Sequence, residues 1–88
     1  MSIINVLKGK FGAFRQAVSD AKRGDVIIYY IGLNCRTATH RLTALGAYQA
    51  GLVLLVQSRL SHDGIFSYRA IRTAKPFHPF REAQDDEI

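Results

Sequence analysis

The sequence has little of several residues that mark particular classes of protein. Its single cysteine, Cys35, cannot form an internal disulfide, and the three scattered histidines do not add up to a structural zinc site. No apolar run reaches the roughly 18 residues of a membrane-spanning helix, and Met1–Leu7 is too short for a signal peptide. We therefore expect a cytoplasmic protein with no metal and no other cofactor, and no contact with a membrane.

Signatures of catalysis are also missing. The chain contains no glycine-rich phosphate loop and no acid and base at a recognisable spacing. Cys35 stands beside Arg36, but no candidate base accompanies the thiol. The sequence therefore predicts that this protein is not an enzyme.

Acidic residues are few and unevenly placed. Four of the seven fall in the last seven positions, so residues 1–81 carry twelve Lys and Arg against three acids, a charge of +9. A small body this basic attracts polyanions, of which nucleic acid is the commonest, whereas simple solubility is the alternative explanation. At 88 residues the chain has room for one core, so we expect one domain over residues 1–80 and a flexible acidic tail over residues 81–88.

Apolar periodicity predicts two helices with a strand between them. The first helix is expected over Lys10–Arg23, within a stripe that begins at Ile3. The next segment, Asp25–Ile31, is apolar on both faces, which indicates a strand covered on both sides. The second helix is expected from Thr37 or Thr39 to Gly51. Its expected inward stripe is Ala38, Leu42 and Leu45, and its outward face is Arg36, His40, Thr43, Ala44 and Ala47.

A β-hairpin is predicted after the second helix. Leu52–Leu60 and Ile65–Thr73 are β-like, and Ser61–Gly64 between them contains the Asp-Gly pair of a tight turn. The face that carries Leu54, Val56 and Ile71 is the better candidate for the core. Beyond the hairpin, Ala74–Phe80 has two prolines and is expected to be an extended segment against the body.

The order helix–strand–helix–hairpin resembles a winged helix-turn-helix domain, over about residues 37–73. The passage Leu45–Gln57 is similar to the step from a recognition helix into a wing. The resemblance implies an α+β fold of two helices and a three-stranded antiparallel sheet. The Gly-Asp-x-Ile-x-Tyr string at Gly24–Tyr29 also resembles small uncharacterised bacterial and phage proteins.

The winged-helix resemblance implies a regulatory, non-catalytic protein of bacterial or phage origin that binds nucleic acid, with duplex DNA favoured and a homodimer plausible. The second helix would supply base and groove contacts, and the hairpin cations would grip phosphates. The expected contact residues are Arg36, Thr39, His40, Arg41, Thr43, Arg59, Arg69, Arg72 and Lys75.

Two alternatives remain open for the hairpin. Phe66 and Tyr68, beside Arg59 and Arg72, form either a stacking platform for single-stranded bases or an ordinary packing surface against the first helix. The same aromatic and arginine face also suits a protein-interaction module, such as a phage-encoded inhibitor of a host protein.

Overall fold

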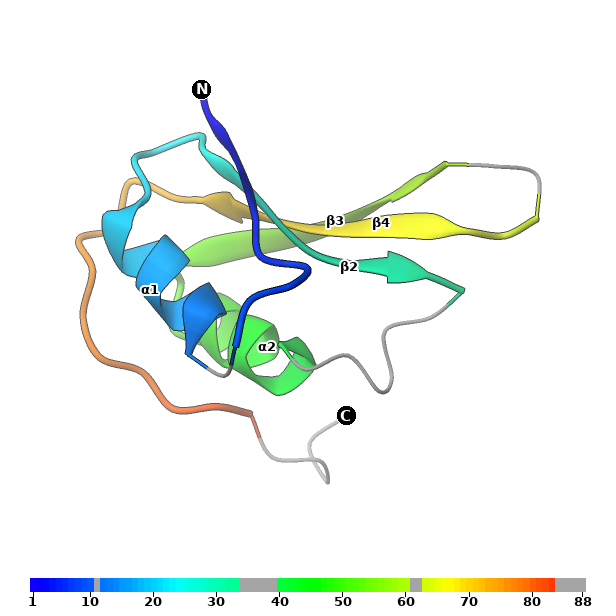
Figure 1. Ribbon diagram of the computed structural model, residues 1–88. Coiled ribbons are helices and arrows are strands. Elements are labelled where there is room, and N and C mark those ends of the chain that lie inside the picture. Colours follow the sequence, from blue (N-terminus) through cyan, green and yellow to red (C-terminus); the bar gives the residue numbers. More distant parts are fainter. Residues whose placement is uncertain (11, 34–39, 61–62, 84–88) are drawn as a thin grey trace.

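Two helices and a four-stranded sheet form two layers in the computed structural model, which describes residues 1–10, 12–33, 40–60 and 63–83. Both helices cover the same side of the sheet, which we call the helix face; the other side is the open face (Figure 1). The elements are, in chain order, β1 (Ile3–Asn5), α1 (Ala13–Asp20), β2 (Val26–Gly32), α2 (Arg41–Gln49), β3 (Val53–Arg59) and β4 (Phe66–Arg72).

The sheet has the order β1-β2-β4-β3, with β1 parallel to β2 and the other neighbours antiparallel. This confirms the α+β class, but the prediction of three antiparallel strands is wrong because it omits β1. Ile3 and Ile4 pair with β2 instead of extending the first helix. Gly12 precedes α1 at φ 94°, and this left-handed backbone prevents the helix from continuing toward the N-terminus.

The core lies between the helices and the sheet. Phe14 and Val18 of α1 are fully buried, together with Ile27 of β2 and Leu52 before β3. Each such side chain stabilises the fold by about 1.5–3 kcal/mol relative to an exposed position. The ring of Phe14 meets that of Tyr29 edge-on, with 5.5 Å between centroids, and this contact fixes α1 on β2.

The buried side of α2 differs from the predicted one. Its buried residues are small, namely Thr43, Ala44, Gly46 and Ala47. The predicted inward residues Leu42 and Leu45 are only half-buried. Small side chains let the helix backbone approach its neighbours closely, and this close approach replaces the packing of larger leucines. Most of the face predicted to point outward therefore lies in the interior.

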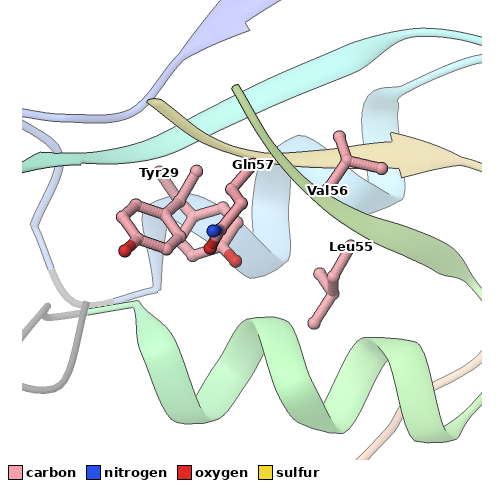
Figure 2. Close-up of a pocket in the computed structure, with 5 residues that line it drawn as sticks. Tyr29, Leu55, Val56 and Gln57 are labelled. Atoms are coloured by element: carbon pink, nitrogen blue, oxygen red, sulfur yellow. The ribbon is translucent and has the colours of Figure 1, made fainter. Parts of the chain in front are cut away.

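The two faces of the hairpin are also reversed relative to the prediction. Val53 and Ala70 are buried in the core, whereas Leu54 is 54 % exposed on the open face. Figure 2 shows Leu55 pointing toward α2 and Val56 pointing to the other side of β3. The helices cover only one side of the sheet, so the prediction that the strand at Asp25–Ile31 is covered on both sides is wrong.

A β-bulge explains the apolar pattern of β2. The register against β4 shifts between Ile28 and Tyr30, which leaves one extra residue in β2. Tyr29 contacts Phe14 on the helix face, and Tyr30 stands opposite Tyr68 on that same face. Two successive aromatic side chains thus share one side of the sheet, which simple alternation does not allow.

The chain beyond β4 runs along the outer side of both helices (Figure 1, orange). The Arg15 guanidinium lies 4.1 Å from the centroid of the Phe80 ring, which ties the segment to α1. Thr43 Oγ1 donates a hydrogen bond of 2.8 Å to Oε1 of Glu82, and the Ala83 N–H donates to the Leu42 carbonyl at 3.0 Å. The expected packing of Ala74–Phe80 is confirmed. Residues 81–83 of the expected tail also lie against α2, and residues 84–88 lie outside the described residues.

Candidate nucleic-acid interface

The residues predicted to contact nucleic acid do not gather on one surface. Arg36 and Thr39 lie outside the described residues. The other seven are divided among the core, the two faces of the sheet and the end of α2, as the following contacts show.

The predicted contacts at the start of α2 point largely inward. His40 is 3 % exposed, its ring stacks on Phe14 at 6.2 Å between centroids, and its Nε2 lies 3.2 Å from the Val6 carbonyl oxygen. Thr43 is 7 % exposed and bonded to Glu82, while Arg41 is half-buried. The prediction that His40 and Thr43 lie on an outward face is therefore wrong. The side chain of His40 packs in the core, and that of Thr43 is covered by the C-terminal segment.

Arg72 is a structural residue. Its side chain is buried, Nε donates to the Val18 carbonyl at 3.0 Å, and Nη1 donates to the carbonyls of Leu52, Thr73 and Lys75 at 3.3, 2.9 and 2.8 Å. These bonds join α1 to the segments before β3 and after β4, at the end of the hairpin opposite its turn. A guanidinium held in this way lies inside the fold and not on an exposed surface, so Arg72 does not join the exposed cations of the hairpin.

The remaining predicted cations lie apart from one another. Arg69 is on the open face, where Nε donates to Ser67 Oγ at 3.0 Å. Lys75 Nζ donates to the Ala50 carbonyl at 2.8 Å, at the C-terminal end of α2, where a cation complements the helix dipole. Arg59 is exposed at the far end of β3, with its guanidinium 5.9 Å from the centroid of the Phe66 ring.

Arg59 lies beside a group of three aromatic side chains, Tyr30, Phe66 and Tyr68, which we call the ring cluster. The centroids of Tyr30 and Tyr68 are 5.8 Å apart, and those of Phe66 and Tyr68 are 6.3 Å apart. All three side chains are half-buried, so part of each reaches solvent. They lie on the helix face, at the end of the hairpin that projects beyond the helices (Figure 1).

A hollow of about 240 Å³ adjoins the ring cluster (Figure 2). It is smaller than the pockets of about 300 Å³ or more that usually hold a whole small ligand. It suits part of a larger ligand whose remainder lies over the cluster. The hollow is lined by Tyr29, Leu55, Val56, Gln57 and Tyr68.

Local backbone geometry holds the ring of Tyr30 in place. A Cβ at Gly32 would stand 2.7 Å from the ring and hydroxyl of Tyr30, so glycine leaves the space that this ring occupies. Tyr30 was missed in the sequence, because only a β-bulge brings it to the same face as Tyr68. The i, i+2 spacing of Phe66 and Tyr68 on a predicted strand was the available signal for the cluster.

The carboxyl group of Asp25, just before β2, has a pKa below its ordinary value. Its carboxylate accepts hydrogen bonds from the N–H groups of Lys22 and Ser2, each at 2.9 Å, and these lower the pKa of Asp25. The site joins the start of β2 to the N-terminal strand. It is distant from the ring cluster along β2 and its role is structural.

Within the described part of the chain, no three His, Cys, Asp or Glu side chains are grouped to hold a metal ion. No helix in that part is long and apolar enough to cross a membrane. No protein-family model matches the sequence, and comparison with curated proteins and with solved structures found no match.

Proposed function

We propose that this protein binds nucleic acid as a small non-catalytic module, and that it holds single-stranded bases on the ring cluster. The observation that carries this proposal is the convergence of Tyr30, Phe66 and Tyr68 with Arg59 on one projecting end of the sheet. Aromatic rings stack on any base, and an adjacent guanidinium can meet a phosphate or a base face.

The geometry favours single strands over a duplex. In a winged-helix complex the second helix enters the major groove, but here Thr43 and Gly46 of α2 are covered by the C-terminal segment. The bases of a duplex are stacked on one another, so flat rings on a sheet cannot reach their faces. Unstacked bases present those faces directly.

The basic charge of the chain supports the same proposal. With +9 over residues 1–81, the body attracts a polyanion from a distance before any contact forms. This attraction is independent of sequence, and stacking tolerates every base. We therefore expect binding with little sequence preference.

The proposal is tested by fluorescence anisotropy with labelled single-stranded DNA, single-stranded RNA and duplex DNA of equal length, at about 50 and 200 mM salt. We expect either single strand to bind more tightly than the duplex. Phe66→Leu keeps the apolar bulk but removes the ring, and it should weaken binding about fivefold or more, since one stacked base contributes about 1–3 kcal/mol.

Two variants serve as matched controls. Phe77→Leu removes a ring that meets Phe80 edge-on in the C-terminal segment, away from the cluster, and it should leave affinity unchanged. Arg59→Gln should reduce the salt slope by about 0.7, the value of one phosphate contact on a single strand, whereas exposed Arg23→Gln should change it less. Tighter binding to the duplex, or equal effects of Phe66→Leu and Phe77→Leu, would reject the proposal.

A second candidate function is a protein-interaction module, and the same cluster favours it because Tyr, Phe and Arg are common anchors of interfaces. Nuclease treatment distinguishes the two. A lysate partner that survives nuclease and is lost with Phe66→Leu supports the protein-binding role, while one that disappears with nuclease supports nucleic acid.

A further inference from the structure

The open face of the sheet carries one row of apolar side chains across its whole width, and beside this row lie the polar side chains of Asn5, Ser58, Ser67 and Arg69. In the pairing register, Ile3, Val26, Ile71 and Leu54 form one row that crosses all four strands. Ile28 and Val56 continue this surface in the next row, on either side of Arg69. Ile3 is 62 % exposed and Leu54 54 % at the two edges of the sheet, whereas Val26 between them is buried and Ile71 is half-buried. The exposed part of this apolar surface therefore lies mainly on the edge strands β1 and β3.

We propose that the open face is the contact surface of a homodimer, in which the sheets of two copies pack face to face. Two sheets pack in this way at about 10 Å, with their side chains interdigitated. The proposal concerns the side of the sheet opposite the ring cluster, so it does not depend on the proposed function.

Charge favours a second copy at this face over any other face of the molecule. Arg69 is the only charged side chain that the described strands place on the open face, and it is bonded to Ser67 Oγ. Arg15 belongs to α1, and the Arg81 carbonyl lies against Gly46 of α2, so both residues are on the helix side of the sheet. A face-to-face dimer keeps these cations of the two copies farther apart than the screening length of about 8 Å, so two basic bodies can associate.

The available area also fits a weak dimer. Seven-residue strands about 3.3 Å per residue long, set about 4.8 Å apart, give a face of roughly 400 Å² in projection. Exposed apolar patches of about 300–600 Å² on single molecules are often functional. Two such faces bury less than the roughly 1,600 Å² of a standard stable complex, so we expect a dimer that dissociates on dilution.

The shape of the row suits a two-fold contact. In a two-fold dimer the same surface of each copy contacts the other, so that surface must be complementary to itself. A row of apolar side chains is complementary to an identical row, because apolar contacts need no matched donor and acceptor. A different protein with an acidic surface, the usual partner for a basic chain, would find only one cation here. The chemistry of the face thus fits another copy of itself.

The test is sedimentation velocity of the full chain from about 1 µM to 1 mM, the range over which a weak dimer forms. We expect the apparent mass to rise from 9.8 kDa toward twice that value. Leu54→Lys places a like charge in the row at an exposed position and should keep the protein monomeric. The control, Tyr48→Lys, changes a 50 % exposed side chain of α2 on the helix side and should leave the dimer intact.

A chain that stays monomeric at about 1 mM overturns the proposal. So does a dimer that Tyr48→Lys disrupts and Leu54→Lys does not. Circular dichroism of both variants shows that they are folded. Because the ring cluster is on the other face, Leu54→Lys should bind single strands as the unmodified chain does, and Phe66→Leu should dimerise normally; loss of one property therefore leaves the other measurable.

Discussion

Arg72 and Arg59 stand at opposite ends of the same hairpin, on the same face of the sheet, and their surroundings differ completely. Arg72 pairs with Val53 at the end covered by the helices, and its guanidinium is bonded to backbone carbonyls. Arg59 pairs with Phe66 at the end that projects beyond the helices, and it is exposed over a ring. The same residue type stabilises the fold at one end and is available to a ligand at the other.

The comparison shows that counting cations is a poor guide to a binding surface. At the covered end of the sheet, the guanidinium donates hydrogen bonds to carbonyls of α1 and of the segments that flank the hairpin. Without it, these carbonyls would lose their donor. At the projecting end, neither α1 nor α2 covers the side chains of β3 and β4. Cover by these helices, not residue type, separates the buried arginine from the exposed one.

The largest expected effect comes from removing the guanidinium at the covered end. Arg72→Met leaves several part-buried carbonyls without their donor and should lower the free energy of unfolding by about 3 kcal/mol. Arg59→Met is the matched change at the projecting end and should cost no more than about 0.5 kcal/mol. Urea denaturation measures both, and equal losses would erase the distinction between the two ends.

Two glycines give a second, smaller comparison. A Cβ at Gly46 would collide with the Arg81 carbonyl oxygen, so Gly46→Ala should destabilise the protein by about 1–3 kcal/mol. A helix without this cover would instead gain about 1 kcal/mol from the same change. The sign of the change in thermal stability therefore reports whether the C-terminal segment is seated on α2.

At the projecting end, Gly32→Ala meets only the outer part of the Tyr30 ring, which can swing away. Stability should change little, and affinity for a single strand should fall because the ring cluster is disturbed. Anisotropy and thermal denaturation on one sample separate the two effects. A large loss of stability with unchanged affinity would contradict the role given to Tyr30.

The smallest expected effect concerns pH at the covered end. The folded pKa of Asp25 is lowered by two backbone N–H donors, so its contribution to stability is present above its unfolded pKa near 3.9 and is lost as pH falls through the folded value. Asp25→Asn should weaken the acid dependence of stability below about pH 4. Unfolding curves between about pH 2 and pH 6 test this, and an unchanged profile would assign the acid sensitivity to other carboxylates.

Much of the strand structure was predictable from local signals. The Asp63-Gly64 turn and the β-branched runs on either side correctly predicted the hairpin, and Gly64 takes the positive φ that such a turn requires. Gly51, where the second helix was expected to end, also has a positive φ, just after the last residue of α2 and its C-cap. These features depend on a few neighbouring residues, which is why the sequence alone is sufficient for them.

The faces of the elements were not predictable in the same way. Leu42 and Leu45 are more hydrophobic than Ala44 and Ala47, but α2 buries the alanines because close backbone approach needs small residues. In the hairpin, Leu54 and Ile71 are more hydrophobic than Ala70 and Arg72, and yet they lie on the open face. Contacts with residues distant in sequence determine which face of each element is buried, so a local sequence pattern does not predict it.

The candidate site was only partly visible in the sequence. Phe66, Tyr68 and Arg59 were identified as one option for binding, but Arg72 was grouped with them and Tyr30 was not. The carbonyls that hold Arg72 come from α1, β3 and the C-terminal segment, which meet only in the folded chain. Tyr30 joins the cluster through the bulge in β2, and an irregularity of one residue leaves no trace in composition.

The bulge between Ile28 and Tyr30 makes the length of this strand as important as its chemistry. A homologue that lacks Ile28 would keep both tyrosines in its alignment, and Tyr30 would still pair with Tyr68, but Tyr29 would stand opposite Arg69 on the open face. Its sequence would look similar, yet Tyr29 would leave Phe14 and the lining of the hollow. Insertions and deletions, more than substitutions, would then separate relatives that keep this surface from relatives that lose it.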